Sequence, residues 1–172
     1  MKIIVVSDTH GRTEALENLL AREDVRKADW LVHCGDIGDD ERWLRNAFAG
    51  AVSIVAGNCD YFTDLPKELT VEREGRRFLI THGNRYISGG IPRLWYRAKE
   101  EACDVVLFGH THMPLVAEED GVLFVNPGSV ALPRQADRRR TYAVINVENG
   151  KAWQETEDGY LKGFFGKLFG KK

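Results

Sequence analysis

The chain has 172 residues, 43% of them apolar, and a formal net charge of −2. This length and composition predict one domain with a real core, and the near-neutral charge excludes general electrostatic binding of nucleic acid or membrane surfaces. Three cysteines without a Cys-x-x-Cys pair argue against a disulfide framework or a zinc finger, and with no signal peptide and no apolar run of about 20 residues we expect a cytoplasmic protein.

Short apolar runs recur along the chain, and most are continuous, which is typical of strands covered on both faces. The expected strands are Ile3–Val6, Trp30–His33, Val52–Ala56, Phe78–Thr81, Val105–Phe108, Val122–Val125 and Tyr142–Val147. Helices are expected at Thr13–Glu23, with Thr13 as N-cap, at Asp39–Phe48, and at Pro92–Cys103 with Pro92 in its first turn.

The second half of the chain has hairpin signals, which indicate a more antiparallel arrangement than the first half. Turns are expected at Gly75, at Asp120-Gly121 and at Asn149-Gly150. The order of elements predicts an α/β fold of two stacked mixed β-sheets flanked by helices.

Residues 1–158 are expected to form this domain, and residues 159–172 a Gly/Phe/Lys tail. In the tail, five apolar residues follow helical spacing among lysines, namely Leu161, Phe164, Phe165, Leu168 and Phe169. An amphipathic helix there would contact an acidic membrane or a partner, or else dock on its own domain or on a second copy as a homodimer.

The main functional signal is a set of side chains suited to metal binding, in five clusters that each follow an apolar run. They are Asp8 with His10, Asp36, Asn58, His82, and His110 with His112. Strand ends converge at one edge of a sheet, and an extended chain past Ser7 would point Asp8 and His10 the same way. Such donors favour Mn, Fe, Zn, Ni or Co over Ca or Mg.

One histidine stands apart from these clusters. His33 lies inside the run Leu31–Cys34. We interpret it as a buried, hydrogen-bonded residue that supports the site rather than as a ligand.

The ordered motifs Asp-x-His, Gly-Asp, Gly-Asn-x-Asp, an isolated His and Gly-His-x-His resemble those of the calcineurin-like metallophosphoesterases. The match runs from Asp8 to about Ser129. The short chain, the Gly57–Asp60 motif and the segment Asn126–Ser129 look like the small bacterial and archaeal phosphodiesterase branch. The metallophosphoesterase-like subunit of retromer shares this fold.

The resemblance implies two divalent ions, with Mn most favoured. Asp8, His10, Asp36 and His112 would hold the first ion, and Asp36, Asn58, His82 and His110 the second, so that Asp36 bridges. A hydroxide between the ions would attack phosphorus. The residues expected in catalysis are Asp36, Asn58, Cys59, Asp60 and His110.

Cys59 departs from the family pattern, where many members have His followed by an acidic residue. That His is thought to assist the leaving group, and a neutral thiol is a weak substitute. We therefore expect a phosphodiesterase that acts on a small phosphodiester, with weak phosphomonoesterase activity. A second departure is Asn84, where relatives often have His, and it is not expected to be a ligand.

The loop Asn126–Ser129 and the arginines beyond it are the remaining candidates. Asn126, Ser129 and Arg134 are expected to contact substrate, with a purely structural turn as the alternative for the first two. The run Arg138–Arg140 fits a solvated loop. Two other functions stay open, a binding scaffold that has lost catalysis and a nucleotide phosphatase.

Overall fold

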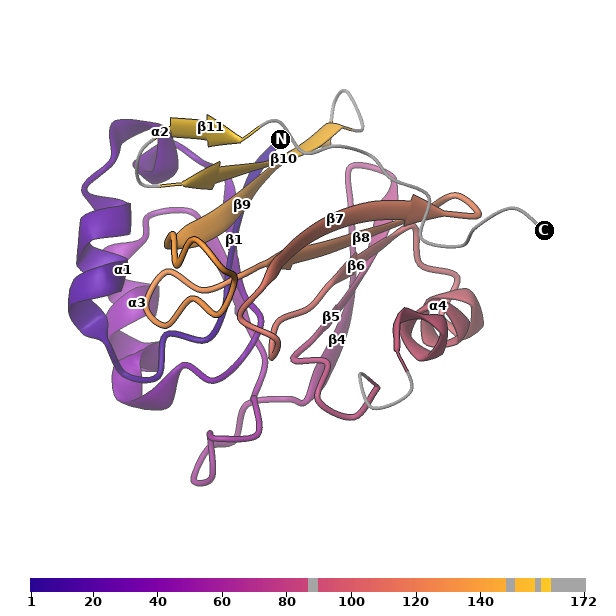
Figure 1. The fold of residues 1–172 in the computed structure, drawn as a ribbon, viewed down its shortest axis with the longest axis horizontal. Coiled ribbons are helices and arrows are strands. Elements are labelled where there is room, and N and C mark those ends of the chain that lie inside the picture. The colour runs from indigo at the N-terminus through magenta and orange to yellow at the C-terminus, as the bar shows by residue number, and fades with distance from the viewer. Residues whose placement is uncertain (87–89, 148–150, 157–158, 162–172) are drawn as a thin grey trace.

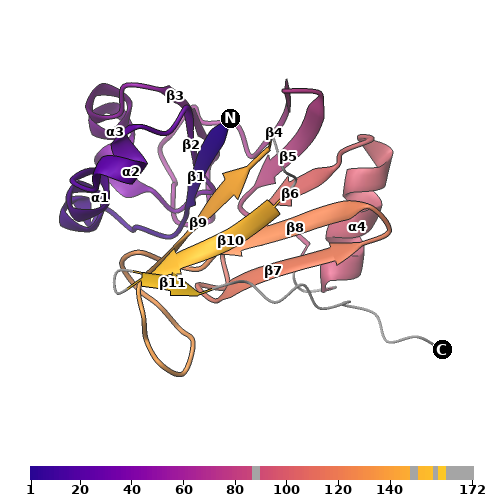
Figure 2. The ribbon, with the colours of Figure 1, turned by 90° about the horizontal axis from the view of Figure 1, so that it is seen from above.

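The computed structural model describes residues 1–86, 90–147, 151–156 and 159–161, the last two segments as backbone only. Two mixed β-sheets lie face to face, with α1, α2 and α3 outside the first sheet and α4 outside the second (Figures 1 and 2). This confirms the predicted α/β fold of two stacked sheets flanked by helices.

The first sheet combines strands from both ends of the chain, in the order β11-β10-β9-β1-β2-β3. Its strands are β1 (Lys2–Val6), β2 (Trp30–His33), β3 (Ala51–Ile54), β9 (Thr141–Asn146), β10 (Lys151–Thr156) and β11 (Gly159–Leu161). β1, β2 and β3 run parallel, whereas β9 is antiparallel to β1. The carboxyl ends of β1, β2 and β3 therefore lie at one edge.

The second sheet has the order β4-β5-β6-β8-β7. Its strands are β4 (Glu68–Arg73), β5 (Arg76–Thr81), β6 (Val105–Leu107), β7 (Pro114–Glu119) and β8 (Val122–Pro127). The predicted hairpins at Gly75 and Asp120-Gly121 are confirmed as β4–β5 and β7–β8. β9 and β10 also pair antiparallel, but their expected turn at Asn149-Gly150 lies outside the described residues.

The helices are shorter than predicted. They are α1 (Thr13–Leu20), α2 (Glu23–Arg26), α3 (Glu41–Ala47), which follows a 3₁₀ turn at Gly38–Asp40, and α4 (Ile91–Glu100). Thr13 is the first helical residue rather than the N-cap, and its hydroxyl donates to Asp40 Oδ1 at 2.7 Å, so the capping prediction was wrong. Pro92 lies in the first turn of α4, as predicted.

Alternate side chains of each central strand enter different layers of the core. Ile3 and Val5 pack between the two sheets, while Ile4 and Val6 pack under the helices of the first sheet. In the second sheet, Phe78 faces the first sheet and Leu79 faces α4. Burial of both faces explains why the strands are continuous apolar runs.

The predicted tail begins in the first sheet. Its residues Gly159–Leu161 form β11, which pairs with β10, and the rest of the tail, residues 162–172, lies outside the described residues. In the described part of the chain, no helix has both the length and the apolar character needed to cross a membrane.

Candidate metal centre

All five predicted clusters lie on loops that follow strands. Asp8 and His10 follow β1, Asp36 follows β2, Asn58 follows β3, His82 follows β5, and His110 and His112 follow β6. Their side chains meet at the carboxyl ends of these strands, which come from both sheets. Potential ligand atoms lie within 4.8 Å of one another in the sets Asp8–His10–His112, Asp8–Asp36–His82 and His10–Asp36–Cys59.

Asp36 lies between two imidazoles. Its Oδ2 is 3.7 Å from Nε2 of His10 and 3.4 Å from Nε2 of His82, while its Oδ1 accepts the Cys59 N–H at 2.7 Å. Burial favours a raised pKa for the Asp36 carboxyl, but the hydrogen bond and charge of His82 and the Cys59 N–H hold this pKa well below its usual value. The carboxylate is therefore ionised and lies between the imidazoles of His10 and His82.

One half of the centre consists of Asp8, His10 and His112. His112 Nε2 is 3.1 Å from Asp8 Oδ1 and 3.3 Å from His10 Nε2. Asp8 Oδ1 is buried and has no hydrogen-bond partner in the described part of the chain. A buried carboxylate oxygen next to two imidazole nitrogens fits a cation, because a cation would satisfy all three atoms.

The other half consists of His82, Asn58 and His110. His82 Nε2 is 3.0 Å from Asn58 Oδ1, and the His82 and His110 rings meet edge to face with centroids 5.1 Å apart. The His110 backbone N–H donates to Asp8 Oδ2 at 3.0 Å, which connects the two halves. Burial and the charge of His82 lower the pKa of His110 and so favour its neutral form, the form that ligates metals.

Backbone carbonyls set the tautomers of two histidines. Nδ1 of His82 lies 2.8 Å from Cys34 O, and Nδ1 of His112 lies 2.6 Å from Leu132 O. A carbonyl only accepts, so each Nδ1 donates its proton. Each Nε2 then directs a lone pair at the cluster when the ring is neutral, which is the arrangement of a metal ligand.

The convergence was predicted correctly, but the reason given for it was wrong. Asp8, His10, His110 and His112 all have left-handed φ values, between 50° and 69°, so the chain does not stay extended past Ser7. Backbone hydrogen bonds support these tight loops: Asp8 N–H donates to Gly35 O and His10 N–H to Asp36 O. Curled loops, and not strand alternation, bring the pairs together.

Asp60 was expected in catalysis, and the structure shows a role in positioning the loops of the centre. Its carboxylate accepts the backbone N–H groups of Gly57, Gly38 and Ile37 at 2.8, 2.9 and 3.3 Å. It therefore joins the loop that carries Asp36 to the loop that carries Asn58, and acts as a positioning residue.

Replacing Asp60 with alanine is expected to weaken Mn²⁺ affinity by about 10-fold or more, because three N–H groups lose their acceptor and the two loops separate. Isothermal titration with Mn²⁺ measures this. Asp64→Ala, at an exposed carboxylate of the same loop, is the control and should leave the affinity unchanged. Equal affinities for the two variants would contradict the positioning role.

His33 supports the centre from below, as predicted. It is fully buried, its Nδ1 accepts the Gly35 N–H at 3.2 Å, and its Nε2 therefore donates to Thr9 Oγ1 at 3.0 Å. Burial lowers the pKa of His33 to about 4, so the ring is neutral near pH 7. His33 thus connects the loop after β1 to the loop after β2. The sequence alone does not identify Thr9 as its partner.

Asn126 and Ser129 were expected to contact substrate, but the structure favours the alternative of a structural turn. Both are fully buried. Asn126 Nδ2 donates to Gly109 O at 2.8 Å, and Ser129 Oγ donates to Asp8 O at 2.8 Å. They hold the ligand loops, and this corrects their assignment as substrate contacts.

Arg134 remains a candidate for substrate contact. Its side chain is exposed, its backbone N–H donates to His112 O at 3.1 Å, and its charge acts on His110. The predicted loop Arg138–Arg140 is exposed as well.

Cys59 lies at the mouth of the centre. Its thiol is exposed and accepts a hydrogen bond from Asn58 Nδ2 at 3.3 Å. Partial burial and the negative charge of Asp36 raise the pKa of the thiol, so it is neutral near pH 7. The mouth of the site therefore has a neutral thiol, which is a weak proton donor.

Comparison with known proteins gives the family. The model of the calcineurin-like phosphoesterase superfamily domain matches residues 1–150. The chain belongs to this superfamily. It is 35% identical to the probable metallophosphoesterase YsnB of Bacillus subtilis, over 88% of each chain. It is 34% identical to the phosphodiesterase YfcE of Escherichia coli K12, over 78% of this chain and 82% of that one.

A solved structure of this superfamily supports the same conclusion. The crystal structure of a predicted phosphoesterase from Streptococcus pneumoniae TIGR4 is 31% identical, has a TM-score of 0.80, and covers 95% of this chain and 94% of its own. The family resemblance seen in the motifs is confirmed. The chain is a phosphoester hydrolase of a family that uses divalent metals, with an Asp/His cluster that could hold such an ion.

Proposed function

We propose that this calcineurin-like phosphoesterase is a dinuclear, metal-dependent phosphodiesterase. The observation that carries the proposal is the position of Asp36 Oδ2 within 3.7 Å of His10 Nε2 on one side and 3.4 Å of His82 Nε2 on the other. A carboxylate between two sets of nitrogen and oxygen donors suits two ions that share one ligand.

The two halves of the centre would give each ion four ligands. Asp8, His10, Asp36 and His112 would hold the first, and Asp36, Asn58, His82 and His110 the second. This mixture of imidazole, carboxylate and amide suits Mn²⁺, with Ni, Zn, Fe and Co also compatible. When bound, the ions would lower the pKa of a water molecule and neutralise charge on the phosphoryl oxygens.

The surrounding residues favour an anionic substrate. Asn58 is neutral, so it leaves positive charge at the centre that a phosphodiester can neutralise. The exposed Arg134 guanidinium can donate to a phosphoryl oxygen as a charge-assisted pair. These residues orient the diester, and the buried loops beneath them keep the ligands in place.

Metal analysis and hydrolysis of bis-p-nitrophenyl phosphate test the proposal. We expect about two divalent ions per chain, loss of turnover with EDTA and recovery with Mn²⁺. Bound metal without turnover of any diester would favour the scaffold alternative. Faster hydrolysis of nucleotide monoesters than of diesters would favour a nucleotide phosphatase.

The neutral thiol of Cys59 predicts a preference for diesters over monoesters. Hydrolysis of an unactivated monoester expels an alkoxide, which is a poor leaving group and needs a proton donor. A His at this position would supply that proton. Cys59→His is therefore expected to raise kcat/KM for glycerol phosphate by about 10-fold or more. Steady-state assays against Cys59→Ser, which adds no such donor, measure the effect. Unchanged monoester turnover in Cys59→His would contradict this account of specificity.

A further inference from the structure

A groove of about 310 Å³ lies beside the metal centre, between the loop that follows β3 and the loop that follows β5. Asn58 lines the groove, and its Oδ1 is 3.0 Å from His82 Nε2. The groove therefore opens on the half of the centre that contains His82. Its volume is at the small end of ligand sites, which span about 300–1,000 Å³. A diester held at the centre can extend one arm into it.

The groove has two cationic side chains that form no ion pair with the Asp60 carboxylate in its lining. Lys67 and Arg85 line it, and both are exposed. Neither side chain forms an ion pair with another residue in the part of the chain that the structure describes. Asp60 also lines the groove, but its oxygens accept three backbone N–H groups. Two cations in a chain of net charge −2 mark a local site for an anion.

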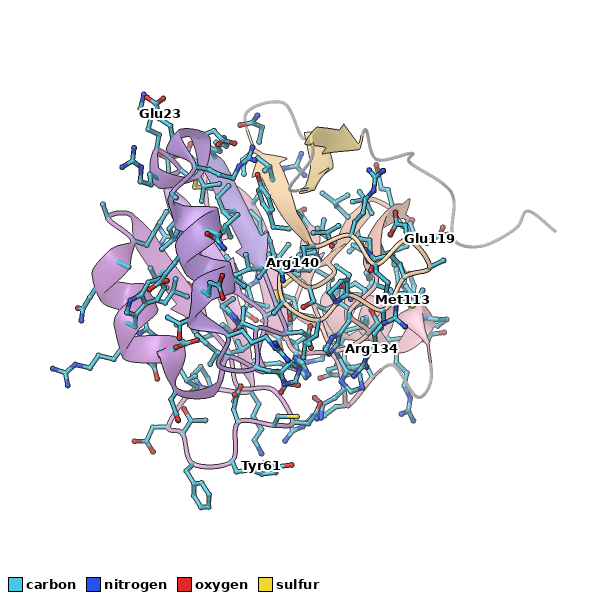
Figure 3. The ribbon with its side chains drawn as sticks, turned by 60° about the vertical axis from the view of Figure 1, so that its left-hand side comes forward. Glu23, Tyr61, Met113, Glu119, Arg134 and Arg140 are labelled. Carbon is cyan, nitrogen blue, oxygen red and sulfur yellow. The ribbon has the colours of Figure 1, made fainter. Side chains whose placement is uncertain are left out.

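The same groove presents an aromatic ring. Tyr61 lines it and is 79% exposed, and Figure 3 shows Tyr61 on a loop that projects from the body of the protein. The base of this loop is closed by the bond from Ala56 N–H to Pro66 O at 2.8 Å. An exposed ring on an anchored loop is a platform on which a planar base stacks. Asn84, across the groove, offers an amide that pairs with polar edges of a base.

We infer that the substrate is a short phosphodiester-linked dinucleotide with a terminal phosphate. Its scissile phosphate lies at the metal centre, the base of one arm stacks on Tyr61, and the terminal phosphate of that arm pairs with Lys67 and Arg85. The inference rests on the proposed phosphodiesterase function. For 5′-phosphoadenylyl adenosine (pApA), water adds to phosphorus, the P–O3′ bond breaks, the 3′ oxygen takes a proton, and two molecules of AMP result.

The test compares two dinucleotides that differ in one group, pApA and ApA, which lacks the terminal phosphate. We expect the wild type to prefer pApA, and the combined variant Lys67→Ala/Arg85→Ala to lower kcat/KM for pApA by about 30-fold. The kcat/KM for ApA should fall far less in this variant, because ApA has no terminal phosphate to pair with the two cations. Arg93→Ala, at an exposed cation of α4, is the matched control and should preserve both rates.

Tyr61→Ala separately tests whether a base stacks on the Tyr61 ring. Loss of stacking should lower kcat/KM by about 10-fold for both dinucleotides, whereas the preference for pApA stays. The inference is overturned if the wild type shows no preference for pApA. It is also overturned if the combined variant lowers kcat/KM equally for both dinucleotides.

The experiment separates this inference from the proposed function. Turnover of bis-p-nitrophenyl phosphate without any preference for pApA would support the proposed function and overturn the assignment of a dinucleotide substrate. If no diester is turned over, isothermal titration of the full chain with AMP and with adenosine decides. Tighter binding of AMP that Lys67→Ala/Arg85→Ala abolishes supports the groove assignment, and equal binding of the two ligands overturns it.

Discussion

Replacing Asp36 with asparagine is expected to lower kcat/KM for bis-p-nitrophenyl phosphate by about a thousandfold, a barrier increase of about 4 kcal/mol. The physical reason is that Asp36 Oδ2 is the one carboxylate oxygen within 4 Å of both His10 and His82 among the described residues. An amide cannot supply the negative charge that holds two cations close together. Metal analysis should show fewer than two ions per chain in the variant.

The control for this prediction is Asp39→Asn. Asp39 is exposed, is close to Asp36 in the sequence and is on the 3₁₀ turn that follows it. This variant removes the same charge without touching the centre, so its metal content and activity should match the wild type. A D36N protein with full metal content and more than a tenth of the wild-type activity would rule out the bridging role.

Replacing Gly57 with alanine is expected to damage the centre even though residue 57 is not a ligand. A Cβ at this position would lie 2.0 Å from Asp36 Oδ1 and 2.3 Å from Asp36 N. The backbone cannot move away without displacing the Asp36 carboxylate. We expect a loss of about 1–3 kcal/mol in unfolding free energy and about 100-fold in kcat/KM. Urea unfolding and diester assays measure the two effects.

Gly75→Ala is the control for Gly57→Ala. It separates the steric clash with Asp36 from the general cost of replacing a glycine. Gly75 has a positive φ of 67°, and a Cβ there would meet nothing within 4 Å. It lies in the β4–β5 turn, seven residues before His82, which is about 23 Å along an extended strand. This variant should lose about 1 kcal/mol of stability and keep its diesterase activity. Comparable activity in Gly57→Ala and Gly75→Ala would show that the close approach at Gly57 is unimportant.

Much of the fold was predictable because continuous apolar runs mark strands that are covered on both faces. Ile3–Val6 and Phe78–Thr81 fall within β1 and β5, and the turns at Gly75 and Asp120-Gly121 are where the sequence placed them. Helix ends were less predictable. Thr13 has the chemistry of an N-cap, but a tertiary hydrogen bond to Asp40 takes its hydroxyl.

The positions of the candidate ligands were predictable too, because the carboxyl ends of neighbouring strands meet at one edge of a sheet. What the sequence did not reveal is which polar residues support the loops. Asp60, Asn126 and Ser129 have side chains suited to catalysis or substrate binding, but each accepts or donates hydrogen bonds to backbone groups of another loop. Those backbone partners have no sequence signature.

The sequence by itself therefore determined the family, the stacked-sheet architecture and the order of the donor side chains, since these follow from local hydrophobicity and motif spacing. Only the tertiary structure decided how Asp8 and His10 converge, which nitrogen of His82 and His112 faces the cluster, and that Tyr61, Lys67 and Arg85 line one groove. These features depend on contacts between residues far apart in the chain, and no local pattern records such contacts.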